Sequence, residues 1–261
     1  MKLSTLTLPS PKTLLACLMS ASLLMPTVQA APSTDLPSEQ ELQAWTKSLN
    51  QMAKKERDPL LASLLFDQFE IANSDDNPIS WEMTGWLGTD QHKVYLNSEG
   101  EQIEGETESE NQLLYSRPLS PFWDLQAGIG MDIMANKSNS WAIIGLQGLA
   151  PYFFEVNAQL LANDETFGIR LEAEYEALFT QKLILTPQIK INAYGADQMQ
   201  YGIGSGLSST EMGLRLRYEI TRKFAPYIGI KRHKLFGKTA DIAADGEDEE
   251  ISAVIGLRFW F

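Results

Sequence analysis

Residues 60–261 alternate between apolar and polar side chains with a period of two, a pattern that predicts β-strands. The clearest case is the C-terminal segment, in which Ile251, Ile255 and Phe259 share one face and Arg258 lies on the other. Four further stretches show this alternation: residues 154–160, 167–179, 183–192 and 211–220. We expect twelve strands: residues 60–72, 78–88, 91–99, 110–117, 121–133, 140–149, 151–162, 166–179, 182–194, 207–220, 223–235 and 250–261.

The connections between these strands alternate in length. Those after even-numbered strands are short: residues 89–90, 117–120, 150–151, 180–181 and 221–222. Those after odd-numbered strands are longer, except near Asn163: residues 73–77, 100–109, 135–139, 195–206 and 236–249. Outer-membrane barrels separate short periplasmic turns from longer outer loops in this way, whereas a soluble sandwich has no reason to do so.

Aromatic residues near the strand ends fit the interfacial girdles of such a barrel. They are Trp81, Trp123, Trp141, Tyr152, Phe153, Phe224 and Tyr227. We therefore predict an all-β fold, an antiparallel transmembrane β-barrel of about twelve strands in the outer membrane, over residues 60–261. Its apolar face would contact lipid, and its charged face would line the lumen.

The first 59 residues follow a different pattern. Residues 1–30 combine a basic start, a short apolar stretch and a small-residue cleavage site, so we predict a secretory signal peptide. Residues 31–59 form a second segment, in which Ser38 to Glu41 is a plausible capping box. A short amphipathic helix follows, with these apolar positions: Leu42, Trp45, Leu49 and Met52. This helix either packs on the domain or frays in solvent, or it plugs the barrel from inside or beneath.

Composition narrows the possible partners. The 261 residues carry a formal net charge of −13, which argues against nucleic acid and is compatible with cation binding. The single cysteine, Cys17, lies in the predicted leader, so a mature chain would have no disulfide and no thiolate metal site. With two histidines in all, a multi-histidine zinc centre is not expected either.

Charged side chains share the predicted luminal face. Glu172, Glu174 and Glu176 occupy successive inward positions of one strand and are candidate metal ligands. The other expected lumen-lining residues are Arg170, Lys190, Glu211, Arg215, Arg217 and Glu219. The simpler alternative is that the carboxylates pair with these arginines and hold the shape of the barrel.

Methionines and histidines offer a few further candidates. Met131 and Met134 lie close together in the sequence near an outer loop, and thioethers suit Cu(I), although no dense methionine run exists. We add His233 to the candidate metal ligands. A barrel-borne lipid hydrolase would need a serine beside His92 or His233, and no local signature supports one, so we expect no enzymatic activity.

Several segments, in order, resemble the CopB copper-resistance family. They are residues 113–117, 122–128, 145–152, 170–176, 202–207, 213–219 and 224–229. The resemblance implies an outer-membrane protein of Gram-negative bacteria linked to copper resistance, and it alone supplies copper as the metal. Many members carry a Met- and His-rich N-terminal segment, whereas residues 31–59 contain one methionine, Met52, and no histidine.

Extensive copper sequestration is therefore not expected. The resemblance implies a barrel that binds copper or exports it across the outer membrane, or that docks a periplasmic copper carrier or multicopper oxidase. Its expected partners are copper ions and outer-membrane lipid. The alternatives are the barrel-borne lipid hydrolase and a structural barrel that transports nothing.

Overall fold

The computed structural model describes residues 38–56, 59–74, 77–103, 105–134, 137–243 and 248–261. The predicted signal peptide and residues 31–37 lie outside this part of the chain. The chain divides into an N-terminal unit that ends at Ala53 and a unit formed by residues 54–261. The second unit contains the strands and is described first.

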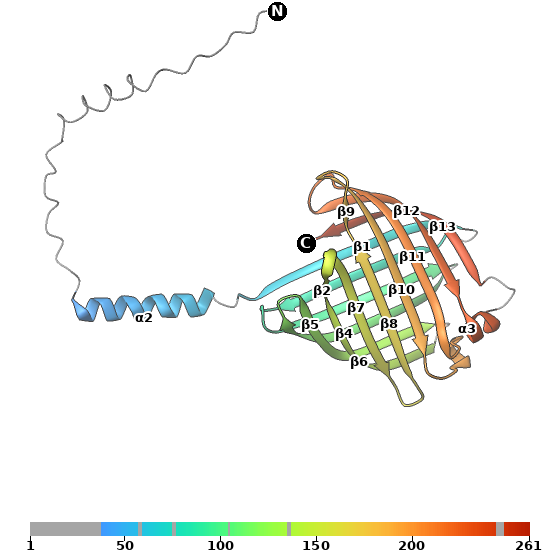
Figure 1. Ribbon diagram of the computed structural model, residues 1–261, viewed down its shortest axis with the longest axis horizontal. Helices are drawn as coiled ribbons and strands as arrows, with labels where there is room; N and C mark the ends of the chain where they lie inside the picture. Colours follow the sequence, from blue (N-terminus) through green and yellow to red (C-terminus); the bar gives the residue numbers. More distant parts are fainter. Residues whose placement is uncertain (1–37, 57–58, 75–76, 104, 135–136, 244–247) are drawn as a thin grey trace, which may run out of the picture. The chain divides into compact units, whose positions relative to one another are not determined.

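One antiparallel sheet closes on itself to form a barrel (Figure 1). Its strands are β1 (Leu61–Asn73), β2 (Ile79–Gly88), β3 (Lys93–Ile103), β4 (Glu106–Ser120), β5 (Trp123–Met134), β6 (Lys137–Ala150), β7 (Phe154–Ala162), β8 (Phe167–Tyr175), β9 (Ala177–Leu178), β10 (Leu183–Tyr194), β11 (Gly206–Tyr218), β12 (Phe224–Leu235) and β13 (Glu249–Trp260). Strands that follow one another in the chain pair, except that β8 and β9 both pair with β10, and β13 pairs with β1 to close the ring.

The prediction of twelve strands is confirmed. The two-residue β9 continues β8 after an interruption at Glu176, and both pair with β10, so they form one side of the ring together. Closure leaves no free sheet edge, which lets the backbone hydrogen bonds be satisfied within a bilayer. The resulting barrel is a transmembrane β-barrel of the outer-membrane type.

The two faces of each strand meet different surroundings. Apolar side chains such as Ile129, Ile228 and Ile255 point outward and are 63%, 60% and 64% exposed. Polar and charged side chains such as Glu70, Gln126 and Asp132 point inward and are almost completely buried. Because a strand alternates its side chains between two faces, the period-two pattern converts directly into a lipid face and a luminal face.

Exposed aromatic residues cluster at the end of the barrel that carries the short turns. They include Phe122, Tyr152, Phe153, Phe224 and Phe261. Two residues assigned to the girdles from the sequence were placed wrongly, because they face the interior. Trp141 and Tyr227 are 2% and 4% exposed, and each lies at a luminal position of its strand.

The other end of the barrel carries two long loops. Residues 195–205 include a short 3₁₀ helix, Met199–Tyr201, and pack Ile203 against a buried apolar cluster. The second loop contains helix α3 (Gly237–Ile242). The other members of the cluster are Leu114, Trp141, Ile143, Leu161 and Tyr194.

The prediction of a long loop over residues 100–109 was wrong. Strand β3 ends at Ile103 and strand β4 begins at Glu106, so only two residues separate them. A run of charged residues resembles a loop in sequence, but its alternate glutamates lie on one face and continue the strand pattern.

The N-terminal unit contains helix α2 (Glu39–Glu56), as predicted. The capping box forms as expected: the amide of Ser38 donates to the carboxylate of Glu41 at 2.8 Å, and the amide of Glu41 donates to the Ser38 hydroxyl at 3.3 Å. The hydrogen bonds from Ser38 hold the pKa of Glu41 below its usual value. In the described part of the chain, neither helix has the length and apolar composition required to cross a bilayer.

Close strand packing predicts a sharp difference between two glycines. A methyl group on Gly128 would lie 2.0 Å from the backbone carbonyl oxygen of Leu113. One on Gly85 would meet a side-chain methyl of Leu64 at 3.4 Å and the carbonyl oxygen of Leu96 at 3.8 Å, which are tolerable distances. We expect Gly128→Ala to lower the free energy of unfolding by about 1–3 kcal/mol, because backbone must shift. Gly85→Ala, the matched control, should leave it unchanged or raise it slightly.

Urea unfolding of the barrel in phospholipid vesicles measures this difference. Equal effects of the two substitutions would contradict the packing described for β4 and β5.

Candidate functional site

A row of four carboxylates crosses the inner wall of the barrel. Glu82 on β2 pairs in register with Glu99 on β3, Glu99 with Glu110 on β4, and Glu110 with Asp132 on β5. Like charges directly opposite one another on neighbouring strands repel and destabilise a sheet. Cations from another part of the barrel would offset this repulsion.

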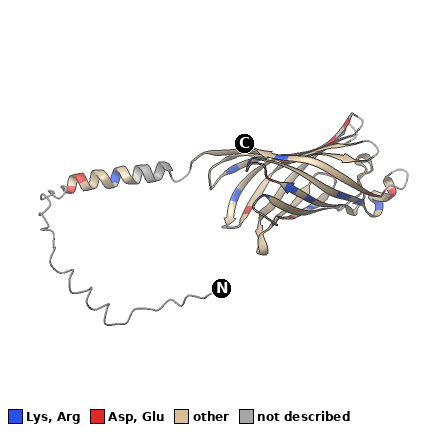
Figure 2. Cartoon of the chain, turned by 90° about the horizontal axis from the view of Figure 1, so that it is seen from above, with Lys and Arg blue, Asp and Glu red and all other residues tan. Residues whose placement is uncertain are grey.

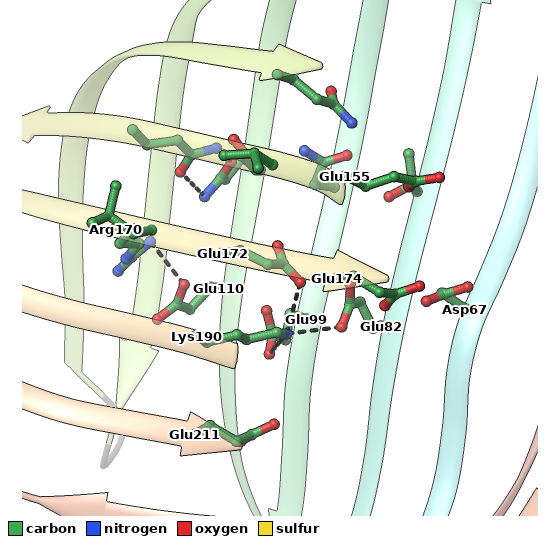
Figure 3. Close-up of a pocket in the computed structure, with 18 of the residues that line it drawn as sticks. Asp67, Glu82, Glu99, Glu110, Glu155, Arg170, Glu172, Glu174, Lys190 and Glu211 are labelled. Carbon is green, nitrogen blue, oxygen red and sulfur yellow. Dashed lines mark hydrogen bonds and ion pairs between the residues drawn. The ribbon is translucent and has the colours of Figure 1, made fainter. Parts of the chain in front are cut away.

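Two cations from the opposite side of the interior meet this row (Figure 3). The Lys190 ammonium on β10 lies 2.8 Å from Glu82 and 2.5 Å from Glu99. The Arg170 guanidinium on β8 lies 2.7 Å from Glu110 and 2.6 Å from Asp132. We call these six residues the cross-barrel latch, since their ion pairs join strands that are not neighbours in the sheet.

A second buried network lies beside the latch. The Arg215 guanidinium makes two hydrogen bonds of 2.9 Å to the carboxylate of Glu70, which also accepts one from the Tyr227 hydroxyl at 2.9 Å. The same guanidinium donates to the side-chain oxygens of Gln68 and Gln188, at 2.6 and 2.8 Å. Both ions are thus paired and hydrogen-bonded, which offsets the cost of their removal from water.

Carboxylates outnumber cations around the remaining space. A cavity of about 450 Å³ inside the barrel includes part of the latch in its wall. Eight carboxylates line it, from Asp67, Glu82, Glu99, Glu110, Glu155, Glu172, Glu174 and Glu211. Three cationic side chains join them, from Arg170, Lys190 and Arg258. Carboxyl groups therefore outnumber cationic groups around this open space.

The three glutamates predicted as metal ligands have different surroundings. Glu172 accepts a hydrogen bond from the Gln188 amide at 2.7 Å and lies 3.9 Å from the Lys190 ammonium. Glu174 lines the cavity, and Figure 3 shows it near Asp67. Glu176 pairs with Arg217 at 2.5 Å and with Arg258 at 3.2 Å, as in the alternative in which these carboxylates hold the barrel shape.

The other predicted ligands are spread over the barrel. His233 lines the cavity and pairs in register with Glu211 and Glu250 on the neighbouring strands. Met131 is 41% exposed on the outward face, whereas Met134 packs against the apolar cluster inside. Since residues 131 and 134 point to opposite faces of β5, their sulfurs cannot converge on one ion.

The predicted lumen-lining residues also lie in different places. Arg170, Lys190 and Glu211 line the cavity, and Arg215 and Arg217 are buried in the interior networks. Glu219 lies just beyond the end of β11.

No group of three or more His, Cys, Asp or Glu side chains in the described ranges is arranged to hold a metal ion. Neither His92 nor His233 is hydrogen-bonded to a serine there; His92 contacts the Tyr115 hydroxyl at 2.5 Å.

Sequence reasoning missed the acidic half of the latch. Glu82, Glu99, Glu110 and Asp132 were not among the predicted site residues. A signal was present, because the glutamates at positions 99, 101, 106, 108 and 110 alternate with other residues and so share one face of a hairpin. The partnership with Lys190 and Arg170 had no such signal, since it joins residues 38 to 108 positions apart.

Comparison with known proteins identifies the family. Residues 60–261 match the family described as copper resistance protein B precursor (CopB). The chain is 44% identical over 203 residues to copper resistance protein B of Escherichia coli, covering 76% of this chain and 69% of that one. It is 43% identical over 200 residues to a homologue of that protein in Pseudomonas syringae pv. tomato, covering 75% and 68%. The chain belongs to the CopB family.

Solved structures support the fold of this CopB-family barrel. A NanC porin matches with a TM-score of 0.51 at 14% identity, over 76% of this chain and 99% of the porin. At that identity the similarity concerns the fold alone. Together, the family and the porin-like closed barrel make this an outer-membrane protein of copper resistance, as the sequence resemblance implied.

The buried arginine of this CopB-family barrel predicts a large effect on stability. Arg215→Met would leave Glu70 charged and unpaired, and we expect it to lower the free energy of unfolding by about 3–5 kcal/mol. Adding Glu70→Gln should recover part of that loss, because the unpaired charge is gone. Urea titration in vesicles measures both, with Lys182→Met in an exposed turn as a control that should change little. Additive losses in the double variant would contradict a direct ion pair.

The two long loops are joined by an ion pair that predicts a pH dependence. Hydrogen bonds from the Lys238 ammonium at 2.7 Å and from the Ser205 amide at 2.8 Å lower the pKa of Asp197 to about 2. Because the folded pKa is depressed, this contact stabilises the loops fully above the usual aspartate range and is lost as the pH falls through about 2.

Carboxyl NMR titration in detergent micelles should give this low midpoint for Asp197 and a higher one after Lys238→Met, because only the hydrogen bond from Ser205 then remains. An ordinary aspartate midpoint in the unaltered protein would contradict the contact.

Proposed function

We propose that this barrel supports copper resistance by binding copper ions in its carboxylate-lined interior and letting them cross the outer membrane. The observation that carries the proposal is the excess of luminal carboxylates, eight against three cationic side chains around one cavity. A low-dielectric wall with one sign of charge concentrates ions of the opposite sign. A cation therefore enters this interior more readily than an anion does.

The chemistry of the wall suits Cu(II). Carboxylate oxygens and the imidazole of His233 are ligands that Cu(II) accepts, whereas the sulfurs of Met131 and Met134 do not meet. The carboxylates are spread along the cavity, so an ion can pass from one to the next without a single tight site. Weak binding at several positions is what conduction requires.

The cross-barrel latch would control the width of this path. Lys190 and Arg170 reach across the interior and occupy the carboxylates that a copper ion would otherwise contact. A periplasmic copper carrier or multicopper oxidase is the expected partner at the end with the short turns. Family and fold favour this non-enzymatic role over lipid hydrolysis.

Conductance in planar bilayers tests the proposal. We expect cation-selective current and a several-fold larger conductance after Lys190→Met, because removing the ammonium opens the latch and leaves more negative charge. Lys182→Met, in an exposed turn between β9 and β10, is the matched control and should change neither property. Absence of current in both the unaltered protein and Lys190→Met would favour the structural barrel, and anion selectivity would refute the proposed path.

Copper itself provides the second arm of this test. Cu(II) efflux from vesicles that contain the protein should fall several-fold in the double variant Glu172→Gln, Glu174→Gln, which removes two luminal charges. Glu39→Gln removes one charge from the first turn of helix α2 and should leave the efflux unchanged. Equal copper efflux in all three proteins would show that the luminal carboxylates are not the route.

A further inference from the structure

Helix α2 exposes apolar side chains along one face. Leu42, Trp45 and Leu49 lie on one side of the helix at spacings of three and four residues, and Trp45 is 65% exposed. Met52 continues the same spacing in the sequence. These side chains are exposed to water in the structure. An exposed apolar face of this kind marks a site of interaction with a protein or a membrane.

The covalent attachment of α2 restricts where that partner can be. The helix ends at Glu56 and β1 begins at Leu61, and five Cα steps span at most about 18 Å. Leu61 pairs with Gly88 at the barrel end that carries the short turns. Leu60 and Phe261 are exposed there, and Phe261 continues the outward, lipid-facing side of β13. The C-terminal end of α2 is thus held close to the edge of the bilayer.

Basic residues are concentrated at the end of this segment that lies next to β1, and acidic residues at the other end. Residues 35–46, far from β1, contain three acidic residues and no basic one. Residues 47–58, next to β1, contain four basic residues, Lys47, Lys54, Lys55 and Arg57, against two acidic ones. Figure 2 shows the acidic residues in the first turn of α2. Basic residues close to a membrane surface are attracted to anionic headgroups.

We propose that α2 lies on the phospholipid surface at the short-turn end of the barrel, with Leu42, Trp45 and Leu49 immersed among the lipids. A tryptophan at the centre of an apolar face is typical of helices that lie in the interface plane. A helix that plugs the barrel or packs on it would not need basic residues at the end next to the bilayer edge. This interaction is independent of the copper proposal, and its test does not involve copper.

Spin-label accessibility in the full mature chain, reconstituted in vesicles of phosphatidylethanolamine and phosphatidylglycerol, tests the proposal. Four single-cysteine variants carry the label: Leu42→Cys and Leu49→Cys on the apolar face, and Gln43→Cys and Lys47→Cys on the polar face. We expect labels on the apolar face to collide several-fold more with oxygen, which is enriched in lipid, than with a water-soluble nickel chelate. Labels on the polar face should show the reverse ratio.

Three results would overturn the proposal. Nickel accessibility at all four positions would mean that the helix stays in water. Protection of the apolar face from both reagents would mean that the barrel covers it, and dipolar broadening between labels would mean that a second copy does.

A matched pair of charge substitutions separates immersion from general loss of structure. With the label at position 42, Leu49→Asp should release the helix and raise the nickel accessibility several-fold, whereas Gln43→Asp adds the same charge to the polar face and should not. Barrel formation in each variant is checked by its heat-modifiable migration in gels. Release by both substitutions would contradict a specific role for the apolar face.

Discussion

The interior of this barrel depends on cations that reach across it. Four carboxylates lie side by side on β2 to β5, where sheet geometry alone would make them repel. Lys190 and Arg170 neutralise them from the opposite wall and thereby tie β8 and β10 to β2, β3, β4 and β5. The backbone hydrogen bonds close the ring, and the latch joins opposite sides of it. Charged side chains therefore occupy the interior of the barrel and also hold its opposite walls together.

This arrangement connects the stability of the barrel with the proposed passage of copper ions. A buried ion pair adds little stability beyond the cost of desolvating both ions, but leaving one ion unpaired is expensive. The latch thus keeps the carboxylates paired while no other cation is present. In the proposed copper path, an entering metal ion would replace an ammonium or guanidinium as the partner of the same carboxylates. The side chains that hold the interior together would then be those that the ion encounters.

The outer surface follows a different constraint, because lipid rather than charge determines it. Ile129, Ile228 and Ile255 face outward from β5, β12 and β13, and exposed aromatics mark the end with the short turns. Placement of α2 at the same boundary would extend that lipid-facing surface into the N-terminal segment. The segment would then leave the periplasmic mouth of the barrel open. Copper resistance in this CopB-family protein would then depend on the barrel interior and not on an N-terminal metal-binding tail.

The sequence alone determined the barrel, its strand number and its two faces, because each strand alternates with a period of two and every turn is local. It also predicted α2 through the capping box at Ser38 and Glu41. Trp141 and Tyr227 were misplaced because an aromatic near a strand end has the same pattern on either face. Only the tertiary structure decided the partners of Lys190, Arg170 and Arg215. Those contacts cross the lumen between residues far apart in the chain, and curvature of the closed sheet, which no local pattern encodes, brings them together.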